Sequence, residues 1–204
     1  MPEQLDALLE KMRALEIELE TEFTRKRGEI EFSVAQSRIH FPLDVLNRHR
    51  LNRVSVWRFL RNSRLLVALT APIIYSGLVV FILMDVFTTV YERLCFPIYG
   101  IPRVRRGDYV VFDRAELPYL NLIEKLNCAY CSYGNGVSAF LQEVAARSEQ
   151  YWCPIKHARK VLGRHGRYAK FFEFGDAESY RAGLERLRSQ YETGSDGPSP
   201  ASTK

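Results

Sequence analysis

Cysteine is scarce in this sequence, with 4 residues in a chain of 204. So few cysteines exclude the disulfide-dense scaffold of a small secreted domain. We also expect no cleavable signal peptide, because residues 1–20 are acidic and amphipathic instead of basic and then apolar. We therefore expect reduced thiols rather than structural disulfides.

Recognisable catalytic motifs are missing as well. The sequence contains no glycine-rich phosphate loop, no G-x-S-x-G nucleophile turn and no H-E-x-x-H zinc-binding helix. Three carboxylates, Asp108, Asp113 and Glu116, lie near one another, but surface charges are the simplest interpretation of such a group. The sequence predicts no reaction and leaves open whether the protein is an enzyme.

The composition is that of a folded chain whose apolar residues are unevenly distributed. Hydrophobic residues make up 47% and charged residues 26%, which excludes a disordered chain. The net charge of +5 suits either nucleic acid or anionic lipid. Because basic residues adjoin the apolar segment 65–101, we expect anionic lipid headgroups as partners and no nucleic acid.

The longest apolar stretch, Leu65–Met84, contains twenty residues without a charge. As a helix it is about 30 Å long, the thickness of the hydrocarbon core of a bilayer. It predicts a transmembrane helix, with a buried helix of a soluble core as the alternative. Asp85 and a further apolar stretch follow, so a re-entrant hairpin over residues 65–101 is a second membrane interpretation. Asp85 is expected at the headgroup level, and burial beside a partner is the costlier alternative.

Residues 28–64 are predicted to form a linker and a basic helix at the lipid headgroups. Trp57 and several leucines alternate there with arginines, a combination that suits the membrane interface. Six arginines belong to this segment: Arg48, Arg50, Arg53, Arg58, Arg61 and Arg64. Further arginines follow the apolar segment, so the positive-inside rule does not decide the orientation. We expect a bacterial inner-membrane protein with a cytosolic C-terminal part, where cysteines stay reduced.

Residues 1–27 are predicted to form an amphipathic helix with a short coiled-coil seam. Its apolar residues follow the 3-4 spacing of heptad a and d positions: Leu5, Leu8, Met12, Leu15 and Leu19. Segment 5–23 is therefore a candidate for homodimerisation or for contact with a partner helix. Packing on the protein's own domain is the alternative. A short strand is expected within residues 28–36.

Three of the four cysteines and one histidine form two local pairs in the C-terminal part. Cys128 and Cys131 are separated by two residues, and Cys153 and His157 are separated by three. Zinc sites are commonly assembled from two such pairs, because each short loop supplies two corners of a tetrahedron. The sequence thus predicts a structural zinc site held by Cys128, Cys131, Cys153 and His157.

Three alternatives to zinc remain for these residues. Thiolates and imidazoles also hold iron–sulfur clusters, although four cysteines are the usual set. The Cys-x-x-Cys pair is also compatible with a redox dithiol, although it lacks the strand–helix context of thioredoxin-like proteins. Ordinary reduced cysteines are the third interpretation. Cys95 is expected to lie apart from the cluster.

Local patterns predict the elements around the cluster and after it. The expected elements are a strand at 109–112, a helix at 117–127, a turn at Gly134–Gly136, a helix from Val137 to about Tyr151, and an amphipathic helix over 176–192. Asp176 is the expected N-cap of the last helix, and residues 193–204 have the composition of a disordered tail. The four metal ligands meet only if the chain folds back between these helices.

Together these features predict a mostly α, membrane-associated helical protein with a small α(+β) metal-binding domain at residues 102–192. The function predicted first is a membrane-anchored adaptor or scaffold with a zinc module in the cytosol. The alternative is a membrane-associated redox protein that uses an iron–sulfur centre or the Cys-x-x-Cys dithiol.

Overall fold

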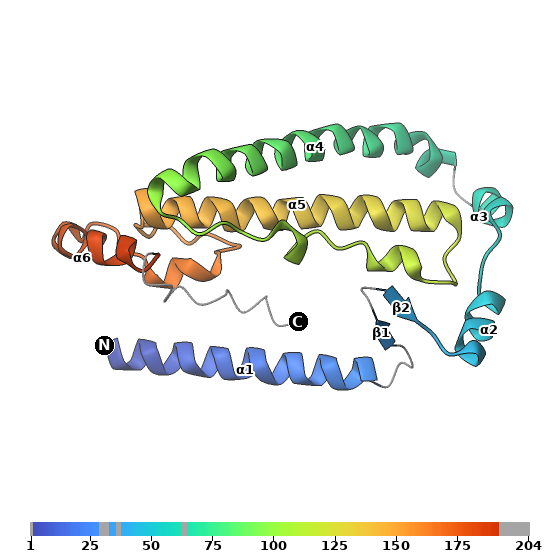
Figure 1. Ribbon diagram of the computed structural model, residues 1–204, viewed down its shortest axis with the longest axis horizontal. Coiled ribbons are helices and arrows are strands. Elements are labelled where there is room, and N and C mark those ends of the chain that lie inside the picture. The colour runs from blue at the N-terminus through green and yellow to red at the C-terminus, as the bar shows by residue number, and fades with distance from the viewer. Residues whose placement is uncertain (1, 29–32, 36–37, 63–64, 192–204) are drawn as a thin grey trace.

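The computed structural model describes residues 2–28, 33–35, 38–62 and 65–191. This part of the chain is mostly helical, as predicted (Figure 1). The helices are α1 (Pro2–Gly28), α2 (Leu43–Leu51), α3 (Val56–Asn62), α4 (Leu65–Tyr99), α5 (Leu122–Trp152) and α6 (Ala177–Ser189). The 3₁₀ turns are η1 (Arg106–Asp108), η2 (Asp113–Glu116) and η3 (Gly166–Lys170).

Two short strands form an antiparallel hairpin between α1 and α2. They are β1 (Ser33–Ala35) and β2 (Arg38–His40), and Val34 lies opposite Ile39. Of the strand expected within residues 28–36, the structure describes only 28 and 33–35. The tail at 193–204 lies outside the described residues.

The two longest helices, α4 and α5, lie side by side and run in the same direction (Figure 1). The segment between them, residues 101–121, returns along the pair from the end of α4 to the start of α5. Ring contacts show the common direction: Tyr75 contacts Tyr130 near the start of the pair, and Tyr99 contacts Tyr151 near its end. Segment 101–121 therefore accompanies both helices over much of their length.

α4 ends at a glycine in the left-handed conformation. Gly100 has a φ of 67°, and the amide of Ile101 donates to the carbonyl oxygen of Phe96 at 2.9 Å. This arrangement is a Schellman motif, which reverses the chain after a helix. Ile101 is buried directly after the turn, so the returning chain begins inside the core.

α5 begins later than the sequence pattern suggests. The side-chain oxygen of Asn121 accepts from the amide of Glu124 at 3.0 Å, and the Glu124 carboxylate accepts from the amide of Asn121 at 2.8 Å. This capping box satisfies two amides that the first helical turn leaves unpaired. The helix expected at 117–127 therefore starts at Leu122, after the turn η2.

The expected turn at Gly134–Gly136 is wrong, because α5 continues through these residues to Trp152. Their glycines permit close packing instead. A Cβ at Gly134 would lie 2.7 Å from the ring of Phe81, and one at Gly136 would lie 2.7 Å from the carbonyl oxygen of Tyr109. Glycine is the residue that lets a neighbouring group approach a helix so closely. Both α4 and segment 101–121 use this approach.

The expected strand at 109–112 is also wrong, since this part of the chain is a turn followed by irregular residues without a strand partner. The amide of Val110 donates to the carbonyl oxygen of Arg106 at 3.0 Å, which closes a turn. Val110 is buried whereas Val111 is exposed. The alternation that indicated a strand is therefore produced by an irregular segment with one side against α5.

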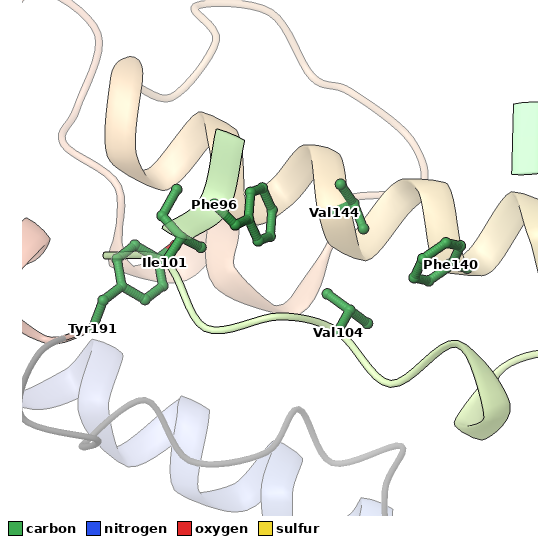
Figure 2. Close-up of a cluster of buried hydrophobic side chains, with 6 residues drawn as sticks. All are labelled: Phe96, Ile101, Val104, Phe140, Val144 and Tyr191. Atoms are coloured by element: carbon green, nitrogen blue, oxygen red, sulfur yellow. The ribbon is translucent and has the colours of Figure 1, made fainter. Parts of the chain in front are cut away.

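A cluster of buried side chains joins α4, α5 and the C-terminal part of the chain. Its members are Phe96, Ile101, Val104, Phe140, Val144 and Tyr191 (Figure 2). Phe96 and Phe140, from α4 and α5, are among the largest fully buried side chains. The cluster contains residues of both the predicted membrane segment, 65–101, and the predicted C-terminal domain, 102–192. α4 and the C-terminal part therefore share one core.

The amphipathic helix expected over 176–192 is present as α6. The Asp176 carboxylate accepts from the amide of Ser179 at 3.0 Å, which confirms Asp176 as the N-cap. Burial of Leu187 and the hydrogen bond from Arg188 to the carbonyl oxygen of Tyr151, at 3.0 Å, hold α6 against the end of α5.

Candidate functional site

Most of the apolar surface of α4 remains uncovered, and Ile74, Leu78, Val80, Ile82 and Val86 are exposed as well as the residues named below. Ala68–Tyr99 is long and apolar enough to cross a membrane, yet only 11% of its apolar window is buried. A core helix of a soluble protein passes the same test of length and composition, but it is mostly buried. We call the following exposed residues the outer face of α4: Leu66, Leu69, Ile73, Val79, Leu83, Phe87, Val90, Leu94 and Ile98.

The opposite side of α4 is polar. Asp85, Thr88 and Glu92 recur at helical spacing, and their exposed fractions are 8%, 0% and 4%. We call these three residues the polar seam. Surface helices of soluble proteins place polar residues toward water and apolar residues toward the core. α4 shows the reverse arrangement over this part of its length.

Asp85 is held by two partners. Arg106 donates to both carboxylate oxygens at 2.8 and 2.6 Å, and Tyr133 donates its hydroxyl at 2.9 Å. The bidentate pair is the strong form of an arginine–carboxylate contact. Burial and the bond to Asp85 raise the pKa of the Tyr133 phenol, so it remains a donor at neutral pH. The hydrogen bonds to Asp85 likewise raise the pKa of Arg106.

The structure shows Asp85 buried beside a partner, whereas its expected level at the lipid headgroups stays a prediction. Its partner Arg106 follows 21 positions later in the sequence, and no sequence motif predicts a contact at that separation. The signal that could have found the seam is the spacing of Asp85, Thr88 and Glu92 on one side of an apolar helix. Glu92 accepts from the amide of Val104 at 2.6 Å, which also connects the seam to the returning segment.

A second buried polar cluster lies where α5 meets η3. The Glu143 carboxylate contacts Arg167 at 2.9 Å and Arg147 at 2.9 Å. Arg167 also donates to the side-chain oxygen of Gln150 at 3.0 Å, and Gln150 is fully buried. Arg147 reaches the carbonyl oxygen of Pro102 at 2.6 Å. The Glu143 carboxylate therefore connects α5 to the C-terminal part through Arg167. Through Arg147 it also connects α5 to the returning segment.

The two cysteine pairs lie at opposite ends of α5. Cys128 and Cys131 occupy one turn near its start, whereas Cys153 is its C-cap. Cys153 follows Cys128 by 25 positions, which corresponds to about 37 Å along a helix. His157 lies only four residues further, and its ring stacks on Tyr168 with centroids 6.1 Å apart. No chain segment of that length brings His157 back to Cys128.

The four predicted ligands are therefore not brought together within this chain. Within residues 2–28, 33–35, 38–62 and 65–191, no group of three or more His, Cys, Asp or Glu side chains forms a metal site. Cys95 lies on α4, outside the two sequence pairs. The predicted zinc or iron–sulfur cofactor stays a prediction from sequence, and within this chain only Cys128 and Cys131 of the four predicted ligands share a helical turn.

The separation of the pairs has a measurable consequence. An ion bound by Cys128 and Cys131 is expected to be retained in Cys153→Ser and His157→Ala, because these positions are too distant to share it. Elemental analysis of purified protein measures the metal-to-protein ratio, with Cys128→Ser as the variant that loses the ion. Loss of metal in Cys153→Ser would restore the single four-ligand set.

A shallow hollow lies between α5 and segment 109–114. It has a volume of about 430 Å³ and is lined by Tyr109, Val111, Asp113, Arg114, Ser132, Asn135, Gly136 and Ala139. The Ser132 hydroxyl is buried and has no hydrogen-bond partner among the described residues. The one carboxylate of the lining, Asp113, makes no hydrogen bond to the Ser132 hydroxyl, so the described residues of the hollow contain no formed pair of nucleophile and base.

Two further surfaces are exposed: the apolar residues of α1, and the tryptophan and arginines of α2 and α3. α1 exposes Leu8, Met12, Leu15, Leu19 and Phe23, most of the seam predicted within residues 5–23. Trp57 on α3 is 75% exposed, and α2 and α3 expose Arg50, Arg58 and Arg61. The predicted basic helix at 42–64 is thus two short helices that precede α4.

Comparison with known proteins gives no relative: no protein-family model, no curated protein and no solved structure matches the chain. The function is therefore argued from the residues of this chain, and the outer face of α4 is the feature with the clearest physical meaning.

Proposed function

We propose that the protein is a membrane-bound adaptor that α4 holds at the lipid while α1 remains available to a partner. The observation that carries the proposal is the outer face, an apolar stripe along most of α4 with the polar seam turned away from it. Monomeric soluble proteins rarely expose apolar patches larger than a few hundred Å². An exposed apolar face with its polar residues turned inward is suited to contact with lipid.

Transfer of the outer face into lipid is energetically favourable. Full burial of a Leu, Ile, Val or Phe side chain contributes about 1.5–3 kcal/mol. The outer face contains nine such residues, each roughly half or more exposed. Transfer of this face into lipid therefore favours membrane binding by several kcal/mol. The two acids of α4, Asp85 and Glu92, do not oppose transfer because both are buried and hydrogen-bonded.

The adaptor part of the proposal is supported by α1. Its exposed side chains Leu8, Met12, Leu15 and Leu19 follow the 3-4 spacing of a coiled-coil seam. A partner helix or a second copy of the chain would cover them. The predicted zinc module is a separate part of the hypothesis, which the metal measurement above tests.

Charges placed on the outer face are expected to release the protein from membranes. The variant Leu69→Glu/Leu83→Glu/Leu94→Glu replaces three side chains that are 63%, 65% and 65% exposed. Each charge adds a cost of several kcal/mol inside lipid, so the membrane-bound fraction should fall at least about tenfold in a flotation assay.

The matched control, Val161→Glu/Leu162→Glu/Phe174→Glu, makes the same charge change at exposed positions beyond α5 and should float like the wild type. Removal of residues 2–28 should also leave flotation unchanged, because α1 is assigned to the partner. A wild-type chain that stays soluble without detergent would contradict the membrane proposal.

A further inference from the structure

The outer face is longer than a perpendicular span requires. It runs from Leu66 to Ile98, nearly the whole of α4. The 35 residues of α4 form a helix of about 52 Å. The hydrocarbon core of a bilayer is only about 30 Å thick. A helix that crossed perpendicular to the membrane would leave a third of this apolar stripe in water.

The side of α4 away from the outer face is covered by α5, which runs along it at the same level. The Tyr130 hydroxyl donates to the carbonyl oxygen of Ile74 at 2.6 Å near the start of the pair, and Tyr91 lies 2.7 Å from the Ser148 hydroxyl near its end. Since the helices are parallel and joined by contacts near both ends, any tilt of α4 carries α5 with it.

Segment 101–121 runs along the same two helices and carries charged residues. Glu92 accepts from Val104, and Asp85 binds Arg106, so the segment runs beside the polar seam. Its exposed charged residues are Arg103, Arg105, Asp108, Asp113, Arg114 and Glu116. Each charge at the centre of a bilayer disfavours insertion roughly a hundredfold. The segment runs along the whole helix pair, so a perpendicular orientation would place some of these charges inside the hydrocarbon core, and it is therefore disfavoured.

We propose that α4 lies in the plane of the membrane, with its outer face in one leaflet and with α5 and segment 101–121 on the aqueous side. This inference rests on the proposed membrane function and specifies its geometry. It places both ends of the chain on the same side of the bilayer. A transmembrane crossing would place the ends of α4 on opposite sides.

The charge distribution around the outer face specifies anionic headgroups. The charged residues of α4 are Asp85, Glu92 and Arg93, and only Arg93 is exposed. The outer face therefore presents no carboxylate to a negative membrane surface. Trp57 and the exposed arginines of α2 and α3 lie directly before α4, where an interfacial helix places its aromatic and basic anchors.

Protease accessibility tests the orientation with the full chain. Protein carrying an epitope tag at each end is added to preformed phosphatidylcholine vesicles with and without phosphatidylglycerol. Both tags should remain cleavable from outside, and binding should weaken at least about tenfold without phosphatidylglycerol. Protection of one tag would overturn the in-plane orientation, and equal binding to both vesicles would overturn the headgroup assignment.

Depth measurements give an independent readout that does not depend on the tags. Nitroxide labels at Leu69→Cys, Leu83→Cys and Leu94→Cys, in a chain with its native cysteines replaced by serine, should report equal depths. A label at Asp108→Cys should be in water. A depth that is greatest at Leu83 and falls toward both other positions would indicate a crossing helix and overturn the inference. If no protein floats with vesicles, the membrane function itself fails; if it floats but crosses, only the orientation fails.

Discussion

Glu143→Leu is expected to lower the free energy of unfolding by about 3–5 kcal/mol, because it leaves two arginines without their shared carboxylate. The side chains of Glu143 and Arg167 are only 9% and 7% exposed, and their atoms approach to 2.9 Å. Removing one partner of a buried ion pair leaves an uncompensated charge away from water. A loss of this size is a large part of the about 5–15 kcal/mol that stabilises a typical domain.

Denaturant unfolding in mild detergent, followed by circular dichroism, measures this loss. Glu185→Leu is the matched control, since Glu185 pairs with Arg188 but is 82% exposed, and exposed pairs contribute less than about 1 kcal/mol. The double variant Glu143→Leu/Arg167→Leu should be less destabilised than the sum of the single variants, because it removes both charges. Equal losses in Glu143→Leu and Glu185→Leu would contradict the buried cluster.

Gly136→Ala is expected to destabilise the protein although alanine is the better helix former. A Cβ at this position would lie 2.7 Å from the carbonyl oxygen of Tyr109 and 2.9 Å from the Cα of Val110. Both atoms belong to the backbone, so segment 101–121 has to move away from α5. Overpacking costs about 1–3 kcal/mol or more, whereas the gain in helix propensity is about 1 kcal/mol.

Gly107→Ala is the control for this effect, because no atom lies within 4 Å of its Cβ position. Its unfolding free energy should change by less than about 0.5 kcal/mol. The same denaturation assay measures both variants. A Gly136→Ala protein more stable than the wild type would show that the returning segment does not pack against α5 at this point.

Several elements were predictable because their causes are local. The twenty uncharged residues from Leu65 to Met84 predicted a long apolar helix, and α4 contains them without the turn that a re-entrant hairpin needs. Asp176 is an N-cap because its carboxylate reaches an amide three residues ahead. Such features depend on neighbours within one helical turn, which the sequence displays directly.

The errors occurred where distant segments decide the local conformation. Gly134 and Gly136 resemble a turn in the sequence, but Phe81 and the Tyr109 backbone pack against them and keep the helix continuous. The same continuity separates Cys128 from Cys153, so a pairing suggested by spacing is not formed within one chain. Short-range spacing carries no information about a straight helix of 31 residues between the two pairs.

The sequence by itself determined that this protein has one long apolar helix, basic flanks and few cysteines, because these are properties of composition and local order. Only the tertiary structure decided which side of α4 stays uncovered. Asp85 and Glu92 acquire partners from segment 101–121, and this contact turns the polar seam inward and the outer face outward. Burying a charged group is favourable only beside a matching donor, and that donor is supplied by the returning chain.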